Sequence, residues 1–394
     1  QETYTIYGGT GAEAIFGGYK ADAIYGKAGN DYILGGDGAD TIDAGAGDDV
    51  IYTSLAGLTE DVSIDGGAGS NTLVFDTPGE SGAWDNESYG AVTFDLSTDL
   101  GNATNFVNIG GGSEADTLTG DTSANVIIGA GGGDTLYGGA GNDTLYGDEH
   151  AGDTSGTTYG IRQYGLTDGA DALYGGAGDD TLYASDGDDT LDGGTGSDTL
   201  TGGSGSDTFI LRAGDGADTI TDFTDDEDSF GLASGTSFGS LTITQSGSDV
   251  LITDGSALSV TLTGIDVSTI DVTDFQSTST DALTLTGTSS NDTLIGGAGN
   301  DVFNGGAGSD TLYGWGGDDT FNISGKTGAF IDIINGGTGT NILNISYVDN
   351  GLSDFSISQI PTSDSAITLT DVNGGQIQFT NILDYTYTSG AAGY

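Results

Sequence analysis

The stretch from Gly175 to Phe209, GGAGDDTLYASDGDDTLDGGTGSDTLTGGSGSDTF, repeats one pattern every nine residues. Each unit carries an Asp that is followed two positions later by a large hydrophobic residue. The Asp residues are Asp180, Asp189, Asp198 and Asp207, and the hydrophobic residues are Leu182, Leu191, Leu200 and Phe209. A carboxylate and a hydrophobe in fixed register indicate a repeated structural unit, because an acidic tract without structure would let its hydrophobic residues drift out of phase.

The same nonapeptide recurs in four runs along the chain, and its sixth position is the candidate metal ligand. The predicted ligands are Asp22, Asp31, Asp40 and Asp49; Asp116, Asp134 and Asp143; Asp171, Asp180, Asp189, Asp198, Asp207 and Asp218; and Asp292, Asp301, Asp310 and Asp319. Every eighth position in these runs is large and apolar. Three units depart from the pattern, since Glu13 and Asn125 replace the Asp and Lys27 replaces a Gly. We expect the turns of these three to bind a metal weakly or not at all.

The composition narrows the classes of function. The 394 residues include 60 acidic and 5 basic ones, for a formal net charge of -55, and 52 of the acidic residues are Asp. Asp is favoured over Glu in tight turns and in calcium loops. Such a charge excludes nucleic acid as a direct partner and opposes a compact state unless cations are bound. No run of 18 apolar residues is present, so we expect no membrane insertion.

The physics of one unit predicts a solenoid. Positions 1 to 6 are rich in Gly and Asp and suit a turn, whereas positions 7 to 9 suit a short strand whose middle side chain points inward. Two units form one coil, so units n and n+2 stack about 4.8 Å apart in two parallel sheets. This stacking places Asp22 beside Asp40 and Asp180 beside Asp198. Carboxylates that close cannot all ionise unaided, and a shared Ca²⁺ with oxygen ligands would remove the conflict.

Two stretches resemble a known family. GGAGNDTLYGD (138–148) and GGAGNDVFNGGAGSDTLYG (296–314) are similar to the repeats-in-toxin (RTX) or hemolysin-type calcium-binding repeats, with the pattern G-G-x-G-x-D-x-U-x. The resemblance implies an all-β protein, a calcium-bound parallel β-roll that is largely unfolded without calcium. It also implies several bound Ca²⁺ ions, type I secretion, and an extracellular or cell-surface location.

The pattern changes between the runs and divides the chain into rolls and spacers. We expect a first β-roll array at 1–75, a β-rich connector or divergent coils at 76–109, a second array at 110–222 with a loop insertion at 148–167, a β-rich cap at 223–286, a third array at 287–345, and a C-terminal β-rich cap at 346–394. A cap has a physical role, because an open solenoid end exposes both core and strand edges.

No catalytic motif stands out, and we predict that the chain is not an enzyme. His150 is the only histidine, which excludes an H-E-x-x-H zinc site. Cysteine is absent, which excludes a thiol nucleophile and any disulfide. The stretch closest to a serine-hydrolase motif, GESGA at 79–83, lacks its last Gly. Paired carboxylates occur throughout, and calcium ligation accounts for them.

The favoured function is that of a secreted calcium-binding structural protein. It would fold on calcium binding outside the cell and assemble with copies of itself into an S-layer, extracellular filament or matrix. The alternative is a non-catalytic adhesion or carbohydrate-binding region of a larger secreted RTX protein, with a cell-surface polysaccharide as ligand. Either the Trp84 segment or the insertion with Tyr159, Arg162 and Tyr164 would supply that site. Ice binding is disfavoured because no unbroken Thr/Asn ladder runs along the first array.

The outward positions of the first array suggest where copies meet. One sheet is expected to present Ala14, Phe16, Tyr32, Leu34, Val50 and Tyr52 on its outer face. An exposed apolar patch of this size is rare on a soluble monomer. We expect the patch to contact a neighbouring copy. The alternative is that residues 54–71, or another loop of the same chain, fold back over it.

The register predicts which Asp of a turn binds the metal. Asp189→Ala should weaken calcium binding, because position 6 supplies the carboxylate shared with the turns of Asp171 and Asp207. Asp192→Ala, at an outward position 9, should change binding little. Calorimetric calcium titration of the two variants measures the difference, and equal losses would contradict the register.

Overall fold

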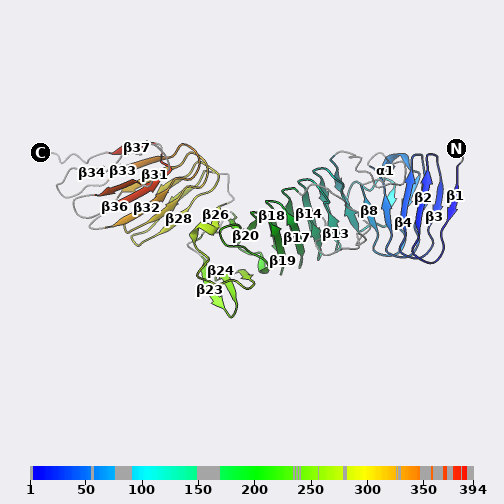
Figure 1. Ribbon diagram of the computed structural model, residues 1–394, viewed down its shortest axis with the longest axis horizontal. Helices are drawn as coiled ribbons and strands as arrows, with labels where there is room; N and C mark the ends of the chain where they lie inside the picture. The colour runs from blue at the N-terminus through cyan, green and yellow to red at the C-terminus, as the bar shows by residue number, and fades with distance from the viewer. Residues whose placement is uncertain are drawn as a thin grey trace.

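The computed structural model is an elongated, almost entirely β protein with its termini at opposite ends (Figure 1). The structure describes residues 3–54, 57–75, 91–148, 169–233, 236, 238, 241–255, 257–277, 282–324, 326, 330–346, 356–357, 367–370, 376–382 and 384–387. Within these residues the helices are α1 (Gly57–Glu60) and the 3₁₀ turn η3 (Val272–Asp274), and no helix is long and apolar enough to cross a membrane. The all-β prediction is confirmed.

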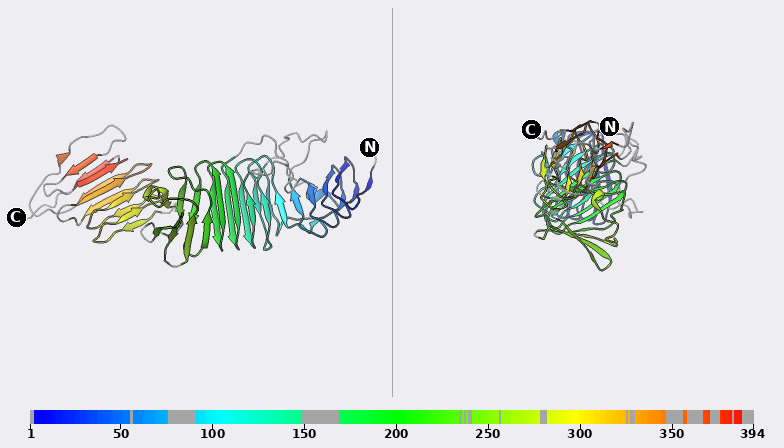
Figure 2. Two further views of the ribbon diagram at one scale, coloured as in Figure 1. Left: turned by 60° about the horizontal axis from the view of Figure 1, so that its bottom comes forward. Right: turned by 90° about the vertical axis from the view of Figure 1, so that its left-hand side faces the viewer.

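One long sheet forms a continuous face along the first two arrays. In spatial order its 13 strands are β2 (Ala14–Gly18), β4 (Tyr32–Gly36), β6 (Val50–Tyr52), β8 (Thr72–Val74), β11 (Asn108–Gly110), β13 (Val126–Ile128), β15 (Thr144–Tyr146), β17 (Thr181–Asp186), β19 (Thr199–Ser204), β21 (Gly216–Ile220), β25 (Leu258–Leu262), β24 (Asp249–Thr253) and β23 (Thr242–Ser246). The strands run across the long axis, so the coils stack along it (Figure 2).

The opposite face is divided into two sheets. The first has β1 (Thr5–Tyr7), β3 (Ala23–Tyr25), β5 (Thr41–Asp43), β7 (Ser63–Asp65) and β10 (Ala103–Thr104). The second has β9 (Thr93–Asp95), β12 (Thr117–Thr119), β14 (Thr135–Ala140), β16 (Ala172–Ala177), β18 (Thr190–Thr195), β20 (Thr208–Leu211), β22 (Ser229–Leu232) and β26 (Phe275–Ser277). The described part of the connector supplies the break, because β9 pairs forward with β12 while β10 pairs back with β7.

The third array and the chain after it form a second pair of sheets. One holds β27 (Thr284–Thr286), β29 (Val302–Asn304), β31 (Thr320–Ser324), β33 (Ile342–Ser346) and β37 (Asp384–Tyr387). The other holds β28 (Thr293–Ile295), β30 (Thr311–Tyr313), β32 (Ile331–Asn335), β36 (Gln376–Thr380), β35 (Ile367–Thr370) and β34 (Ser356–Ile357). Both rolls therefore end in antiparallel strands, β23–β24 in the first case and β34–β35 in the second.

The pairing register follows the nonapeptide. Ile15 pairs with Ile33, and Leu182 pairs with Leu200, each 18 residues further along and in parallel. The predicted stacking of units n and n+2 is therefore confirmed. Across the predicted insertion the ladder resumes, since β14 pairs with β16 and β15 with β17. The insertion itself, with His150, Tyr159, Arg162 and Tyr164, lies outside the described residues, as does Trp84.

Strand lengths differ from the expected three residues in the middle of the second array. From β16 to β19 each strand has six residues, because pairing continues into the turn, as between Gly176 and Gly194. Glycines without side chains let neighbouring turns approach closely enough to pair. The parallel ladder also runs past residue 222, since β22, β25 and β26 pair in parallel with earlier coils.

The interior consists of the eighth positions of the repeats. Ile24, Ile33, Leu182 and Leu191 are completely buried in one continuous core that spans the first two arrays. A second core fills the C-terminal roll, where Phe303 and Phe321 stack with ring centroids 4.6 Å apart. Each coil thus contributes a thin layer of core, and its stability depends on the coils before and after it.

The outer face of the first array differs from the expectation. Val50 and Tyr52 are buried, Tyr32 and Leu34 are half-buried, and Phe16 is 54% exposed. The buried members continue along the long sheet into a cluster with Val74, Ile128, Ala130 and Tyr146. An exposed patch of six residues is therefore wrong. Within residues 54 and 57–71, the described part of the segment considered as a cover, Leu58 and Ile64 pack in the interior core and not in this cluster.

The core position predicts an asymmetric response to truncation. Leu182→Ala should lower the free energy of unfolding by about 2–5 kcal/mol, because it removes most of a fully buried side chain and leaves a cavity that the neighbouring coils cannot fill. Thr181→Ala, at the neighbouring outward position, should change it by less than about 0.5 kcal/mol. Denaturant unfolding in saturating calcium tests this, and similar losses for both variants would contradict the inward direction of position 8.

Candidate metal centres in the turns

The position-6 carboxylates form ladders along the turns. In each ladder, Oδ1 of one Asp accepts a hydrogen bond from the backbone N–H of the position-6 residue one coil earlier. Asp22 N donates to Asp40 Oδ1 at 2.7 Å, and Asp180 N donates to Asp198 Oδ1 at 2.7 Å. This neighbour relation was predicted and is confirmed. The hydrogen bond fixes the side chain and directs its other oxygen, Oδ2, into the turn.

That second oxygen is buried and has no hydrogen-bond partner in most of the turns. The residues concerned are Asp22, Asp31, Asp40, Asp49, Asp134, Asp143, Asp180, Asp189, Asp198, Asp207 and Asp319. A buried polar atom without a partner is costly, and a buried carboxylate oxygen is more costly than a neutral one. So regular a row of such atoms indicates a missing positive partner.

The surroundings of Oδ2 supply further oxygens. A Cβ placed on Gly175 would lie 2.6 Å from Asp180 Oδ2 and 2.5 Å from the carbonyl oxygen of Gly193 in the next coil. A carboxylate oxygen and a carbonyl oxygen thus face the same point, which the absent side chain of position 1 leaves free. Within the described residues no three acidic or imidazole side chains converge, so a cation here would need backbone carbonyl ligands as well.

Two of the three Asn residues at position 6, Asn71 and Asn341, show which groups surround this point. Asn341 Nδ2 donates to the carbonyl oxygen of Gly336 at 2.8 Å and to that of Asn381 at 3.1 Å. Asn71 Nδ2 donates to the carbonyl oxygen of Asn105 at 3.0 Å. Where the side chain has an amide donor, carbonyl oxygens accept from it. Where it has a carboxylate, the same arrangement of oxygens requires a cation.

The turns fall into two conformations, which we call open and closed. In an open turn the residue at position 2 has a positive φ, as at Gly36 (φ 89°) and Gly176 (φ 106°), and the Oδ2 of position 6 lacks a donor. In a closed turn the N–H of position 2 donates to the position-6 side chain. The closed turns are Gly9 to Glu13, Gly112 to Asp116, Asp121 to Asn125, Thr224 to Asp228, Thr288 to Asp292 and Gly297 to Asp301.

Open turns occur even where position 2 is not glycine. Lys27 (φ 81°), Ala130 (φ 99°), Ser185 (φ 93°) and Trp315 (φ 68°) all keep the left-handed backbone. That conformation is unfavourable for residues with a Cβ and persists only when the surroundings impose it. Stacking between coils therefore dominates over the local preference of the residue.

Burial changes the protonation of the ladder carboxyls. The pKa of Asp134 is raised to about 8, and the pKa values of Asp189 and Asp207 are raised to about 7, chiefly because burial desolvates these carboxyl groups. Neighbouring carboxylates contribute to the rise, and backbone hydrogen bonds oppose it. Without a bound cation, the ladder holds protons that an exposed Asp would release.

Several predicted ligands lie in different surroundings. Asp116, Asp292 and Asp301 lie in closed turns, where a backbone N–H satisfies Oδ2. Asp310 accepts from the ammonium of Lys326 at 2.6 Å. The remaining two, Asp171 and Asp218, belong to the ladder through Oδ1, which accepts from Asp134 N and Asp198 N respectively.

The ladder also includes residues that the repeat pattern missed. They are Asp61, Asn71, Asp228, Asp332 and Asn341, whose side-chain oxygens accept from position-6 N–H groups one coil earlier. Asn71 and Asn341 end Gly-rich turns, GGAGSN (66–71) and GGTGTN (336–341), in which Asn replaces the Asp. Asp228 and Asp332 lack such a turn, but each is followed two positions later by a large hydrophobic residue, and that spacing could have identified them.

Asp192 is not the exposed bystander that its outward position suggested. It is buried and forms a two-bond ion pair with Arg212, whose Nη2 lies 2.7 Å from Asp192 Oδ2 and Nη1 3.1 Å from Oδ1. Arg212 also approaches Asp215 at 3.7 Å. Removing Asp192 would therefore disturb a buried charge pair. Asp186, exposed at position 3 of the same turn as Asp189, is the better control.

The turns can be compared with known proteins. The family model of the RTX calcium-binding nonapeptide repeat matches residues 7–42, 16–51, 53–77, 110–149, 167–200, 183–220 and 286–321, which together cover slightly more than half of the chain. No curated protein matches the chain.

Two solved structures are similar to parts of it. The AlgE6R3 subunit of the mannuronan C5-epimerase from Azotobacter vinelandii is 24% identical, with 42% of this chain and 79% of that chain covered and a TM-score of 0.17. The extracellular lipase LipA from Serratia marcescens is 17% identical, with 64% and 43% covered and a TM-score of 0.19. The chain thus spans less than half of the lipase's length.

The raised pKa values predict how the metal-free protein responds to pH. Between about pH 4 and pH 8 the folded ladder binds more protons than the unfolded chain, so the free energy of unfolding falls as pH rises through this window. In chelator, circular dichroism should show more β structure at pH 4 than at pH 8. Calcium competes with the same protons, so its affinity should rise over that range. Equal β content at both pH values in chelator would contradict the desolvated ladder.

Proposed function

We propose, from the premise that the chain belongs to the family of RTX calcium-binding nonapeptide repeat proteins, that it is a non-catalytic extracellular structural protein that folds on binding calcium and then assembles with copies of itself. The observation that carries this proposal is the row of buried Oδ2 atoms in the open turns, each without a hydrogen-bond donor.

The open turns would hold several calcium ions. Their position-6 carboxylates supply negative oxygens, and the neighbouring carbonyl groups supply neutral ones, as beside Gly175. Hard oxygen ligands on flexible glycine-rich backbone suit Ca²⁺, whereas Zn²⁺ prefers nitrogen and sulfur and Mg²⁺ demands stricter octahedral geometry. A bound ion would neutralise the stacked carboxylates and link one coil to the next.

The charge of the chain makes folding depend on location. Extracellular calcium modules often bind at roughly 10⁻⁴–10⁻³ M, a concentration found outside cells and not in the cytosol. With a net charge of -55 and a core one side chain deep per strand, the chain would stay expanded before export. It would then fold after leaving the cell, which suits the type I secretion expected of the family.

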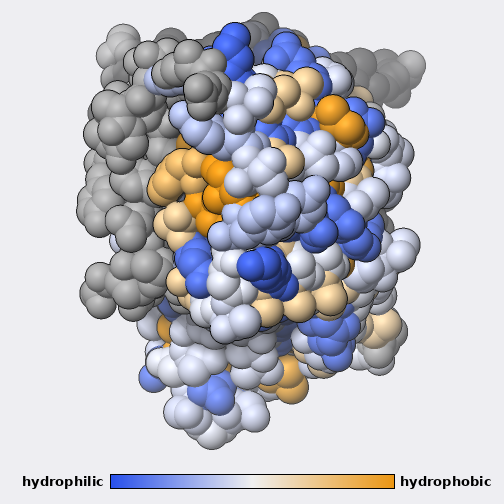
Figure 3. Space-filling view, turned by 90° about the vertical axis from the view of Figure 1, so that its right-hand side faces the viewer, coloured by the Kyte–Doolittle hydropathy of each residue, from blue (hydrophilic) through white to orange (hydrophobic). Residues whose placement is uncertain are grey.

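Assembly would use the outer face of the first array. The position-9 row on the long sheet runs from buried Val74 and Tyr52 through half-buried Leu34 to Phe16, which is 54% exposed. Hydrophobic side chains lie amid hydrophilic ones at this end of the molecule (Figure 3). A second copy seated on Phe16 and Leu34 would extend the buried row. Repeated contacts of this kind would give an S-layer, filament or matrix.

Chelation and one surface substitution test the two parts of this proposal. By circular dichroism and negative-stain microscopy, the protein should show full β structure and ordered polymers in calcium, but much less β structure and no polymers in chelator at neutral pH. Phe16→Asp should abolish polymers while leaving calcium-induced folding intact. Val62→Asp, which adds the same charge at a side chain that is 66% exposed, should assemble normally.

Other outcomes would reject one part or both. Full β structure in excess chelator would contradict calcium-driven folding. Lone rods from the unmodified protein in calcium would contradict self-assembly and favour the adhesion region of a larger secreted protein. Polymers of the Phe16→Asp variant would mean that the copies meet elsewhere.

A further inference from the structure

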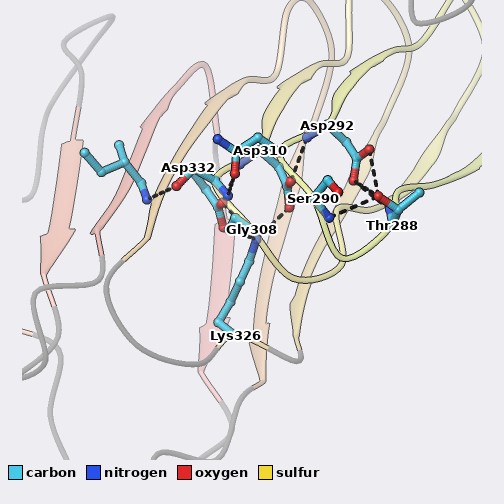
Figure 4. A network of polar contacts seen from close by, with 10 residues as sticks. Thr288, Ser290, Asp292, Gly308, Asp310, Lys326 and Asp332 are labelled. Carbon is cyan, nitrogen blue, oxygen red and sulfur yellow. Dashed lines mark hydrogen bonds and ion pairs between the residues drawn. The ribbon is translucent and has the colours of Figure 1, made fainter.

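One lysine of the third array lies inside a turn. Lys326 follows β31 and precedes β32, and its side chain is fully buried. Its Nζ donates to Asp310 Oδ2 at 2.6 Å, to Asp332 Oδ1 at 2.9 Å and to the carbonyl oxygen of Gly308 at 3.0 Å (Figure 4). The ammonium thus has three oxygen partners, two from stacked carboxylates and one from the backbone of the turn.

The turn around Asp310 otherwise has the geometry of an open turn. Gly306 at position 2 has a φ of 87°, and Asp310 N donates to Asp332 Oδ1 one coil later at 2.9 Å. In the other open turns such a carboxylate has an Oδ2 without a donor. Here the same oxygen accepts from Lys326. The ammonium therefore stands beside the oxygen that has no hydrogen-bond donor in the other open turns.

The burial of this ammonium has a physical requirement. A buried charge is stable only when it is paired and hydrogen-bonded, and Lys326 meets this requirement through Asp310 and Asp332. Its Nζ also lies 5.2 Å from the ring centroid of Phe330. A divalent ion in this turn would have to displace the ammonium, because both would bind the carboxylates of Asp310 and Asp332.

Three further turns of the third array also have a hydrogen-bond donor at this point. Asp292 and Asp301 lie in closed turns, where backbone N–H groups satisfy Oδ2, and Asn341 replaces the carboxylate with an amide. Asp319 and Asp332 keep a buried Oδ2 without a donor, as do Asp134, Asp143, Asp180, Asp189, Asp198 and Asp207 of the second array. The second array therefore has more turns in which a bound cation would satisfy a buried carboxylate oxygen.

We propose that Lys326 is a tethered cation that replaces calcium in its turn, so that the coils around Asp310 and Asp332 fold without the metal and exclude it. The inference rests on the proposed calcium-dependent folding of the other arrays. The third array would then be a folded unit before calcium is encountered, and the second array would fold only afterwards.

Hydrogen exchange of the unmodified full chain in chelator tests this directly. Backbone amides of β30 and β32 should remain protected, while those of β17 and β19 should exchange as in an unfolded chain. If β30 and β32 exchange as fast as β17 and β19, the inference is wrong. If all four strands stay protected, the proposed calcium-dependent folding is wrong instead, so the two failures are distinguishable.

Substitution of the lysine gives an independent test. Lys326→Met keeps most of the side-chain stem and removes the charge, so β30 and β32 should lose protection in chelator. The variant should also bind about one further calcium ion per chain at saturation. Lys20→Met, at an exposed lysine, should change neither property. Unchanged protection and unchanged stoichiometry in Lys326→Met would overturn the inference.

A third variant covers the case in which Lys326→Met fails to fold even with calcium. Adding Asp310→Asn and Asp332→Asn removes the charges that the ammonium compensates. Restored protection of β30 and β32 in chelator would support the tethered cation. Continued failure of the triple variant would show that Lys326 acts through packing, and would overturn the proposal.

Discussion

The structure depends on one electrostatic constraint, the stacking of carboxylates in neighbouring coils. Each ladder Asp accepts a backbone N–H through Oδ1, as Asp198 does from Asp180, and this bond holds Oδ2 inside the turn. The same spacing that aligns the carboxylates aligns the core side chains, so Leu182 cannot stack on Leu200 unless Asp180 also stacks on Asp198. Packing and charge repulsion are thus coupled, and a cation that relieves the repulsion stabilises the core.

The chain satisfies this constraint in several chemical ways. In a closed turn, a backbone N–H of the same turn donates a hydrogen bond to the position-6 side chain, as Gly297 N does to Asp301 Oδ2. An Asn supplies an amide donor, as Asn341 does to Gly336. Lys326 brings an ammonium. An open turn has none of these and so requires an ion from solution. The choice among them, coil by coil, sets how strongly each part of the roll would depend on calcium.

Much of this arrangement could be predicted from the sequence, because a nine-residue period with one inward position per unit leaves little freedom. The two-sided roll, the 18-residue register and the neighbour relation of Asp22 and Asp40 all follow from that period. The open or closed state of a turn does not follow from it. Lys27 and Trp315 adopt a positive φ that their residue types disfavour, whereas Gly112 and Gly297 do not, so contacts between coils decide.

Contacts between distant residues were likewise beyond the local pattern. Asp192 occupies an outward position, yet Arg212, 20 residues later, covers it and pairs with it. Tyr52 and Val50 occupy outward positions in a row that the fold buries. Lys326 lies between strands and outside any repeat, and only the stacking of Asp310 on Asp332 shows what it binds. In each case the partner comes from another coil.

Long-wavelength anomalous diffraction from crystals grown in calcium would test the central claim most directly. We expect anomalous peaks beside the Oδ2 atoms of open turns such as those of Asp180, Asp189 and Asp198. We expect no peak in the closed turns of Asp116 and Asp301, and none between Asp310 and Asp332. Peaks in the closed turns, or empty open turns in saturating calcium, would contradict the claim.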